Sequence, residues 1–205
     1  MNSDFYIIII DDSLKSNAPL VARMKKLCCK ENVLLIREVD KAIEFIMSHL
    51  DYRMIIFMDC KFNNGQSQGV DGLIKIRERT SLISIIMMSA NSLNQMSNAE
   101  IKEMINAENI YFIDNDDMHG AEKCVKEIRE RWISSLDCIL EQWVLSHDGV
   151  TRSKPYMKTE KGVMSLADIL SEIRKRTPIG IDIENGILQY AITRLTEDIK
   201  HNQDA

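Results

Sequence analysis

The sequence predicts an α/β domain over residues 1–130, built on a five-stranded parallel sheet and followed by an extended fifth helix and a small α-helical module. Short apolar runs alternate with segments of helical spacing five times in the first 120 residues. Continuous apolarity is typical of strands covered on both faces, and the strand–helix repeat favours a doubly wound parallel sheet. Glycine and proline number only 8 and 3 among 205 residues, too few for the many hairpins of an all-β fold.

The five expected strands are short and rich in isoleucine and methionine, as buried strands often are. In chain order they occupy residues 5–10, 33–36, 54–58, 83–88 and 110–113. Periodicity alone does not give their order in the sheet.

Helix signals stand between these runs. Pro19 marks the start of the first helix, where a missing N–H costs nothing. Asp40 is expected to cap the second helix, and Leu73 belongs to the apolar stripe of the third. Ser97 precedes Glu100 by three residues, a capping box that predicts the start of the fourth helix.

The fifth helix is expected to begin near Asp117 or His119 and to continue through residues 131–145. Apolar residues recur along it at steps of three and four, and Trp132 and Trp143 are separated by 11 residues. An 11-residue repeat keeps one stripe on one side of a nearly straight helix. The second half of this helix extends beyond the sheet and needs a partner, either the chain's own C-terminal helices or a second copy.

The remaining sequence predicts a linker over residues 146–163 and a helical hairpin over residues 164–205. Ser165 is expected to cap the first of these helices, and Asp182 the last, with a break at residues 177–180. Two helices of this size are too small to close a core alone. We therefore expect them to dock on the long helix, on the sheet domain or on another chain.

The composition limits the classes of partner. The chain has 26 basic and 31 acidic residues, a net charge of −5, whereas a general nucleic-acid binder is expected to be basic. No apolar run approaches the roughly 18 residues that span a bilayer, so no membrane attachment is expected. The 5 cysteines are an odd number without zinc-site spacing, which indicates the reduced thiols of a cytoplasmic protein.

Acidic and hydroxyl residues follow three of the expected strands. Asp11 and Asp12 come after the first strand, Asp59 after the third and Ser89 after the fourth. The carboxyl ends of parallel strands meet at one edge, where three carboxylates repel one another unless a cation neutralises them. Mg²⁺ suits such a partial carboxylate set. A metal beside a hydroxyl indicates phosphoryl chemistry, without deciding whether phosphate is a substrate or a resident.

These residues and their spacing resemble the receiver domain of bacterial response regulators, over about residues 4–130. The motifs that carry the resemblance are I-I-D-D, I-I-F-M-D, G-V-D-G-L-I-K-I-R and I-I-M-M-S-A. The resemblance implies a flavodoxin-like sheet. It also implies that a partner histidine kinase or phosphotransfer protein phosphorylates Asp59.

The same resemblance assigns roles to five further residues. Asp11 and Asp12 would hold Mg²⁺ together with the phosphoacceptor, and the backbone carbonyl of Lys61 would complete the protein ligands. Ser89 would donate a hydrogen bond to the phosphoryl group. Tyr111 falls at the position of the aromatic switch residue.

The chain departs from the family pattern in two places. Asp114 falls near the position where the family has a lysine, and no cis-proline follows it. Residues 60–70 form a longer loop than usual, without the family's Met-Pro, which we interpret as a flexible polar lid or docking loop. Lys61 and Lys75 are the candidates for a substitute cation.

The expected function is that of a cytoplasmic response regulator and not of an enzyme, because residues 164–205 have no nucleophile with a base and no phosphate loop. Phosphorylation of Asp59 would change partner binding or a homodimer formed through the long helix or the C-terminal helices. One alternative is a phosphorylation-independent pseudo-receiver adaptor, motivated by Asp114. A second is a DNA-binding transcriptional regulator that uses the C-terminal helices and the basic run 174–176.

Overall fold

A computed structural model describes the chain apart from a few short stretches, which are residues 1–4, 51, 64–66, 91–96, 160–161 and 204–205. The chain divides into two compact units, Met1–Arg131 and Trp132–Ala205. Each unit is described by itself.

The first unit alternates strands with helices. Its elements are β1 (Tyr6–Ile10), α1 (Pro19–Leu27), a short 3₁₀ helix (Lys30–Asn32), β2 (Val33–Ile36), α2 (Val39–Ser48), β3 (Met54–Asp59), α3 (Gly69–Arg77), β4 (Ser84–Ser89), α4 (Asn98–Asn106), β5 (Ile110–Asp114) and α5 (Met118–Ser134). The strands form one sheet in the order β2-β1-β3-β4-β5, and every neighbouring pair is parallel. This confirms the predicted five-stranded parallel sheet and gives it the flavodoxin-like order.

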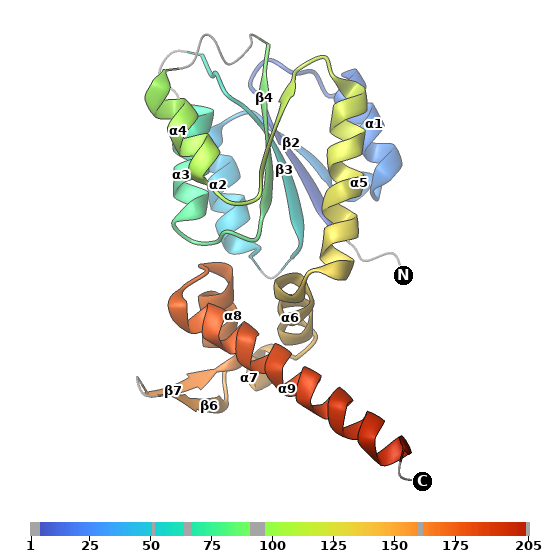
Figure 1. The fold of residues 1–205 in the computed structure, drawn as a ribbon. Coiled ribbons are helices and arrows are strands. Elements are labelled where there is room, and N and C mark those ends of the chain that lie inside the picture. The colour runs from blue at the N-terminus through green and yellow to red at the C-terminus, as the bar shows by residue number, and fades with distance from the viewer. Residues whose placement is uncertain (1–4, 51, 64–66, 91–96, 160–161, 204–205) are drawn as a thin grey trace. The chain divides into compact units, whose positions relative to one another are not determined.

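Helices cover both faces of this sheet, with α2, α3 and α4 on one face and α1 and α5 on the other (Figure 1). Successive side chains of β1 point to opposite faces of the sheet. Ile8 and Ile10 belong to the core cluster that includes Ala42 and Ile46 of α2. All of these side chains are fully buried, so the sheet is the rigid platform that carries the residues at its edge.

The expected helix caps agree with the structure in part. Ser97 and Glu100 form the predicted capping box of α4. The cap predicted for α2 is wrong, because Glu38 occupies that position and Asp40 lies in the first turn. Arg77 is the last residue of α3. It donates hydrogen bonds to the backbone carbonyls of Ile83 and Asn109 and thereby joins α3 to the segments that lead into β4 and β5.

The prediction of one continuous fifth helix is wrong. Helix α5 ends at Ser134, Ser135 has an extended backbone with φ −90° and ψ 138°, and α6 (Leu136–Leu145) begins directly after it. Serine is a weak helix former because its hydroxyl competes for nearby backbone groups. Two consecutive serines therefore interrupt a helix that the apolar repeat alone would continue.

The second unit contains more than helices. After α6 come α7 (Gly149–Arg152), β6 (Pro155–Thr159), β7 (Gly162–Ser165), α8 (Leu166–Arg174) and α9 (Pro178–Gln203). The two strands pair antiparallel. The prediction of a linker over residues 146–163 is wrong, and the reason is that both strands are largely exposed and therefore lack the apolar run by which buried strands are recognised.

Helix α8 supplies the centre of this second unit. Ser165 caps it, as predicted, in a capping box with Asp168. Its buried apolar face packs against α6 and α9, and consists of Leu166, Ile169, Leu170 and Ile173. The predicted cap of the last helix is wrong, since α9 begins at Pro178 and Asp182 lies inside it. Among the described residues, no helix has both the length and the apolarity required to cross a bilayer.

Candidate functional site

Three carboxylates meet at the carboxyl edge of the sheet. One carboxylate oxygen from each of Asp11, Asp12 and Asp59 lies within 4.8 Å of those of the other two. The register explains their meeting, because Ile10 and Met58 are partners on the adjacent strands β1 and β3 and the three residues follow directly. Asp11 is 1% exposed and Asp59 is 9% exposed, so two of the three carboxylates are buried.

Local hydrogen bonds fix two of these carboxylates. The Oδ1 atom of Asp11 accepts bonds from the N–H and hydroxyl of Ser13 and from the N–H of Leu14, each 2.8 Å long. The Oδ2 atom of Asp12 accepts a bond from the N–H of Asn63 at 2.9 Å and another from the Asn63 side-chain amide. The contacts of Ser13 and Asn63 are not among the predictions from sequence, although Asn63 lies in the polar loop that follows Asp59.

The electrostatics of Asp59 favour a bound cation. Burial raises the pKa of Asp59 to about 6, and the negative charge of Asp11 acts in the same direction, against a lowering by the Lys61 N–H. That N–H lies 3.4 Å from the Asp59 Oδ1 atom. The donors are all hard carboxylate oxygens, and three of them leave positions open for water or phosphate. This set fits Mg²⁺.

Ser89 ends β4 at the same edge and is buried. The N–H of Cys60 donates to the carbonyl of Met88 at 2.9 Å, so the pairing of β3 with β4 continues to the level of Ser89. On the next strand the register partner of Ser89 is Asp114, an exposed residue. Tyr111 is half-buried and lies three residues before the end of β5.

The two candidate substitute cations make different contacts. The Lys61 Nζ atom lies 3.2 Å from Oε1 of Glu100, a residue of α4. The Lys75 Nζ atom lies 2.8 Å from Oδ1 of Asp40, on α2. Only Lys61 is next to the acidic cluster along the chain, two residues after Asp59.

The loop after Asp59 also depends on a glycine. A β carbon at position 69 would overlap the backbone carbonyl oxygen of Asp59. Gly69 is therefore required for the close approach of α3 to the end of β3. The lid predicted over residues 60–70 includes Gly69, and residues 64–66 of that loop lie outside the described part of the chain.

Comparison with solved structures identifies the fold of the first unit. A structure described as a "putative two-component system response regulator/ggdef domain protein" aligns with a TM-score of 0.52 and 19% identity, over 65% of this chain and 52% of that chain. A second, described as a "probable two-component system response regulator/GGDEF domain protein", gives the same values. This chain thus spans about half the length of both. The first unit has the fold of a response regulator receiver domain.

Comparison of the sequence with known families and proteins found no match. No protein family matches the chain, and no curated protein matches it. The roles of individual residues must therefore be inferred from the geometry at the carboxyl edge of the sheet.

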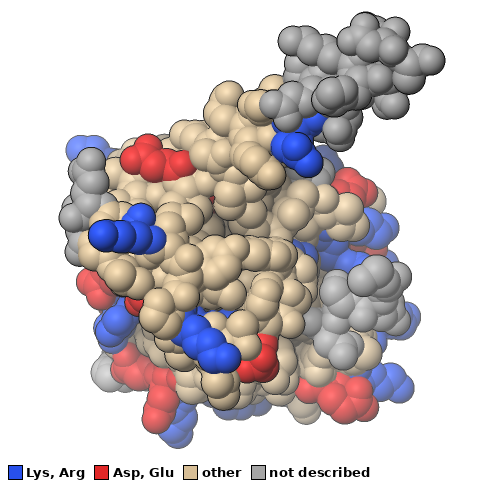
Figure 2. Space-filling view, turned by 90° about the horizontal axis from the view of Figure 1, so that it is seen from below, with Lys and Arg blue, Asp and Glu red and all other residues tan. Residues whose placement is uncertain are grey.

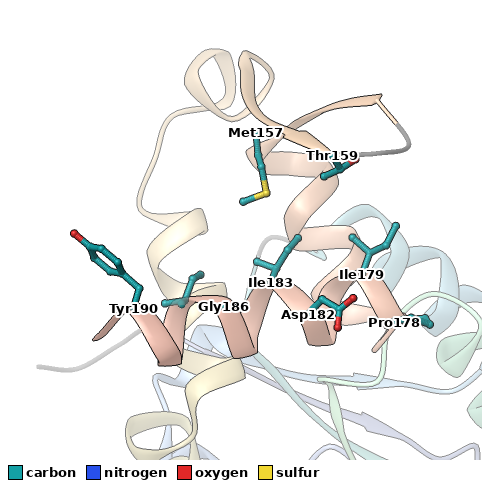
Figure 3. A pocket seen from close by; sticks show the side chains of 9 residues that line it. Met157, Thr159, Pro178, Ile179, Asp182, Ile183, Gly186 and Tyr190 are labelled. Atoms are coloured by element: carbon teal, nitrogen blue, oxygen red, sulfur yellow. The ribbon is translucent and has the colours of Figure 1, made fainter. Parts of the chain in front are cut away.

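The second unit has a groove lined mainly by apolar residues. In Figure 2, residues other than Lys, Arg, Asp and Glu make up much of the surface in view, with basic and acidic residues among them. This groove of about 760 Å³ lies between β6 and α9, with Met157 and Ile183 on its two sides (Figure 3). Asp182 is the charged residue in its lining. The groove is therefore suited to an apolar segment of a protein.

The basic run of the second unit is used internally. The Arg174 Nε atom lies 2.8 Å from Oε1 of Glu141, and both side chains are buried. The Arg176 Nη1 atom lies 2.8 Å from Oε2 of Glu184. Two of the three basic groups expected to face a DNA backbone thus have carboxylate partners within the unit.

Proposed function

We propose that this chain is a response regulator whose first unit accepts a phosphoryl group on Asp59 from a partner histidine kinase or phosphotransfer protein. The observation that supports this most strongly is the meeting of three carboxylates within 4.8 Å at the carboxyl edge of a receiver fold. Asp11, Asp12 and Asp59 would hold Mg²⁺, and the carbonyl of Lys61 would be the fourth protein ligand.

In the proposed transfer, a carboxylate oxygen of Asp59 attacks the phosphorus atom of a phosphohistidine. A P–O bond forms as the P–N bond breaks, and the imidazole leaves with the bonding pair. Bound Mg²⁺ supplies neutralising charge on the phosphoryl oxygens. The hydroxyl of Ser89 donates a hydrogen bond to one of those oxygens.

The phosphoryl group adds a charge of about −1.5 to −2 at this edge. Ser89 moves toward the group, and Tyr111 on the neighbouring strand β5 turns inward. The surface formed by α4, β5 and α5 changes as a result. Such a local change of charge biases a two-state element and thereby carries the signal.

We further propose that the output is association with a second copy of this chain through the second unit. Helix α9 lines the groove with Ile183 and Tyr190, and Leu188 is an exposed apolar residue elsewhere on its circumference. In a two-fold dimer both copies contribute the same surface. A second copy would therefore bring its own α9, with the same exposed apolar residues, to this groove.

Sedimentation velocity of the full chain tests this function. Treatment with acetyl phosphate and Mg²⁺ is expected to shift the monomer–dimer equilibrium of the unmodified protein, whereas Asp59→Asn should respond to neither reagent. An identical response of both proteins would contradict the proposal.

A pseudo-receiver adaptor is the second candidate, and the observation in its favour is Asp114 beside Ser89. In that case partner binding and oligomeric state are the same for the unmodified protein and for Asp59→Asn. The DNA-binding alternative has less support, because Arg174 and Arg176 are held by Glu141 and Glu184.

A further inference from the structure

The phosphoryl group of the proposed function requires a cation, and this inference rests on that proposed function. Strand β5 ends in a carboxylate, Asp114. Among the described residues just after the other strands, Arg37 follows β2 and Lys61 follows β3. Either side chain, Arg37 or Lys61, is a candidate to bind the phosphoryl group.

Arg37 lies on the wrong side of the site. In the sheet order, β2 is separated from β4 by β1 and β3. The Arg37 Nη1 atom donates to the backbone carbonyl of Asp12 at 2.9 Å, on the side away from Ser89. Arg37 therefore stabilises the loop that carries Asp12, and it is too far along the sheet to serve a phosphoryl group beside Ser89.

Lys61 lies on the side of Ser89. Its strand, β3, is the direct neighbour of β4, and its side chain reaches α4, the helix that follows β4. Its own N–H is directed at Asp59, 3.4 Å from the Oδ1 atom. The ammonium group thus moves on a flexible stem that begins two residues from the phosphoacceptor.

Glu100, which forms an ion pair with Lys61, also accepts a hydrogen bond in the capping box of α4. Oε1 of Glu100 lies 3.2 Å from the Lys61 Nζ atom, while Oε2 accepts the N–H of Ser97 at 2.8 Å in the capping box of α4. The side chains of Lys61 and Glu100 are 56% and 25% exposed. Such an ion pair contributes little free energy and exchanges readily.

We propose that Lys61 is the phosphoryl-binding cation of this chain and that it leaves Glu100 when Asp59 is phosphorylated. A phosphoryl group carries more charge than one carboxylate and accepts stronger charge-assisted hydrogen bonds, so it competes successfully for the ammonium group. The exchange frees the first turn of α4 from the loop after β3. The state of Asp59 is thereby communicated to α4 by a single side chain.

The test compares four variants of the full chain treated with acetyl phosphate and Mg²⁺, with the rate of phosphoryl incorporation followed by intact mass. Lys61→Gln is expected to slow incorporation roughly tenfold, as the loss of a charged hydrogen bond would. Glu100→Gln is expected to accelerate it, because Lys61 loses its competing partner, while glutamine still completes the capping box. The double variant should behave like Lys61→Gln alone.

Lys75→Gln is the matched control, since it removes a comparable exposed ion pair with Asp40 and should incorporate phosphate at the unmodified rate. If Lys61→Gln and Glu100→Gln both slow the reaction, the pair is merely structural and the inference is wrong. It is also wrong if the gain from Glu100→Gln persists in the double variant, which indicates a general charge effect. Absence of incorporation into the unmodified protein would overturn the proposed function itself, and this inference with it.

Discussion

Asp114 is the register partner of Ser89 on the adjacent parallel strand, so an acidic residue lies next to Ser89 at the carboxyl edge of the sheet. Both residues end their strands, and the sheet fixes their spacing. A negative charge at this place opposes an incoming phosphoryl group. Under the proposed function, the site therefore accepts a phosphoryl group against this repulsion.

Reversing this charge should improve the site. Asp114→Lys is expected to raise the rate of phosphoryl incorporation from acetyl phosphate by roughly tenfold, because it exchanges repulsion for attraction at close range. Asp116→Lys makes the same change of charge in the turn beyond the strand and should have a smaller effect. Equal rates for the two variants would show that Asp114 has no special relation to the phosphoryl group.

The raised pKa of Asp59 predicts how stability depends on pH. Folding raises this pKa from 3.8 to about 6, so the folded state binds the proton more tightly, and Asp59 reduces stability as the pH rises through that window. Asp59→Asn should therefore increase the free energy of unfolding by about 1–2 kcal/mol at pH 7, after solvent screening is allowed for, and by little near pH 4. Urea unfolding at both pH values measures this.

The control for that measurement is Asp116→Asn, an exposed carboxylate whose replacement should change stability by less than about 0.5 kcal/mol at either pH. Mg²⁺ should stabilise the unmodified protein and reduce its deficit relative to Asp59→Asn. A stability difference that is the same at pH 4 and pH 7 would show that the Asp59 pKa is not raised.

Gly69 is predicted to be intolerant of any side chain. Gly69→Ala brings a β carbon onto the backbone carbonyl oxygen of Asp59, so the end of β3 or the start of α3 must shift. We expect a loss of about 1–3 kcal/mol in the free energy of unfolding of the first unit, as in other overpacked sites. Gly149→Ala has open space around its β carbon and serves as the control. Unchanged stability of Gly69→Ala would contradict the observed close approach.

The proposed dimer depends on the apolar surface of α9. Tyr190 is 67% exposed, so Tyr190→Glu should fold normally yet weaken self-association at least about tenfold, because a charge is costly in an apolar interface. Gln189→Glu adds the same charge one residue earlier on the helix and is the control. Sedimentation equilibrium decides the matter, and an unmodified protein that stays monomeric at every concentration would exclude the second copy as the occupant.

The parts of the fold that were predictable from the sequence are those with a strong local signal. Buried strands such as β3 are continuous apolar runs, and the cap at Ser97 has its partner three residues away. The break at Ser135 was not predictable from the apolar repeat, since that repeat continues across it. The hairpin of β6 and β7 was missed because exposed strands carry no such pattern.

The candidate site was predictable to the extent that parallel strands end at a common edge. The positions of Asp11, Asp12 and Asp59 follow from that rule. The contacts of Asn63 with Asp12 and of Glu100 with Lys61 do not follow from that rule, because both depend on how the loop after β3 folds. Spacing along the chain carries no information about such contacts.

The most direct test of the central claim is the intact mass of the chain after treatment with acetyl phosphate, with and without Mg²⁺. We expect the mass of one phosphoryl group to be added to the unmodified protein in the presence of Mg²⁺, and none without the metal or in Asp59→Asn. Incorporation that persists in Asp59→Asn, or that never occurs in the unmodified protein with either acetyl phosphate or a phosphorylated histidine kinase, would contradict the account.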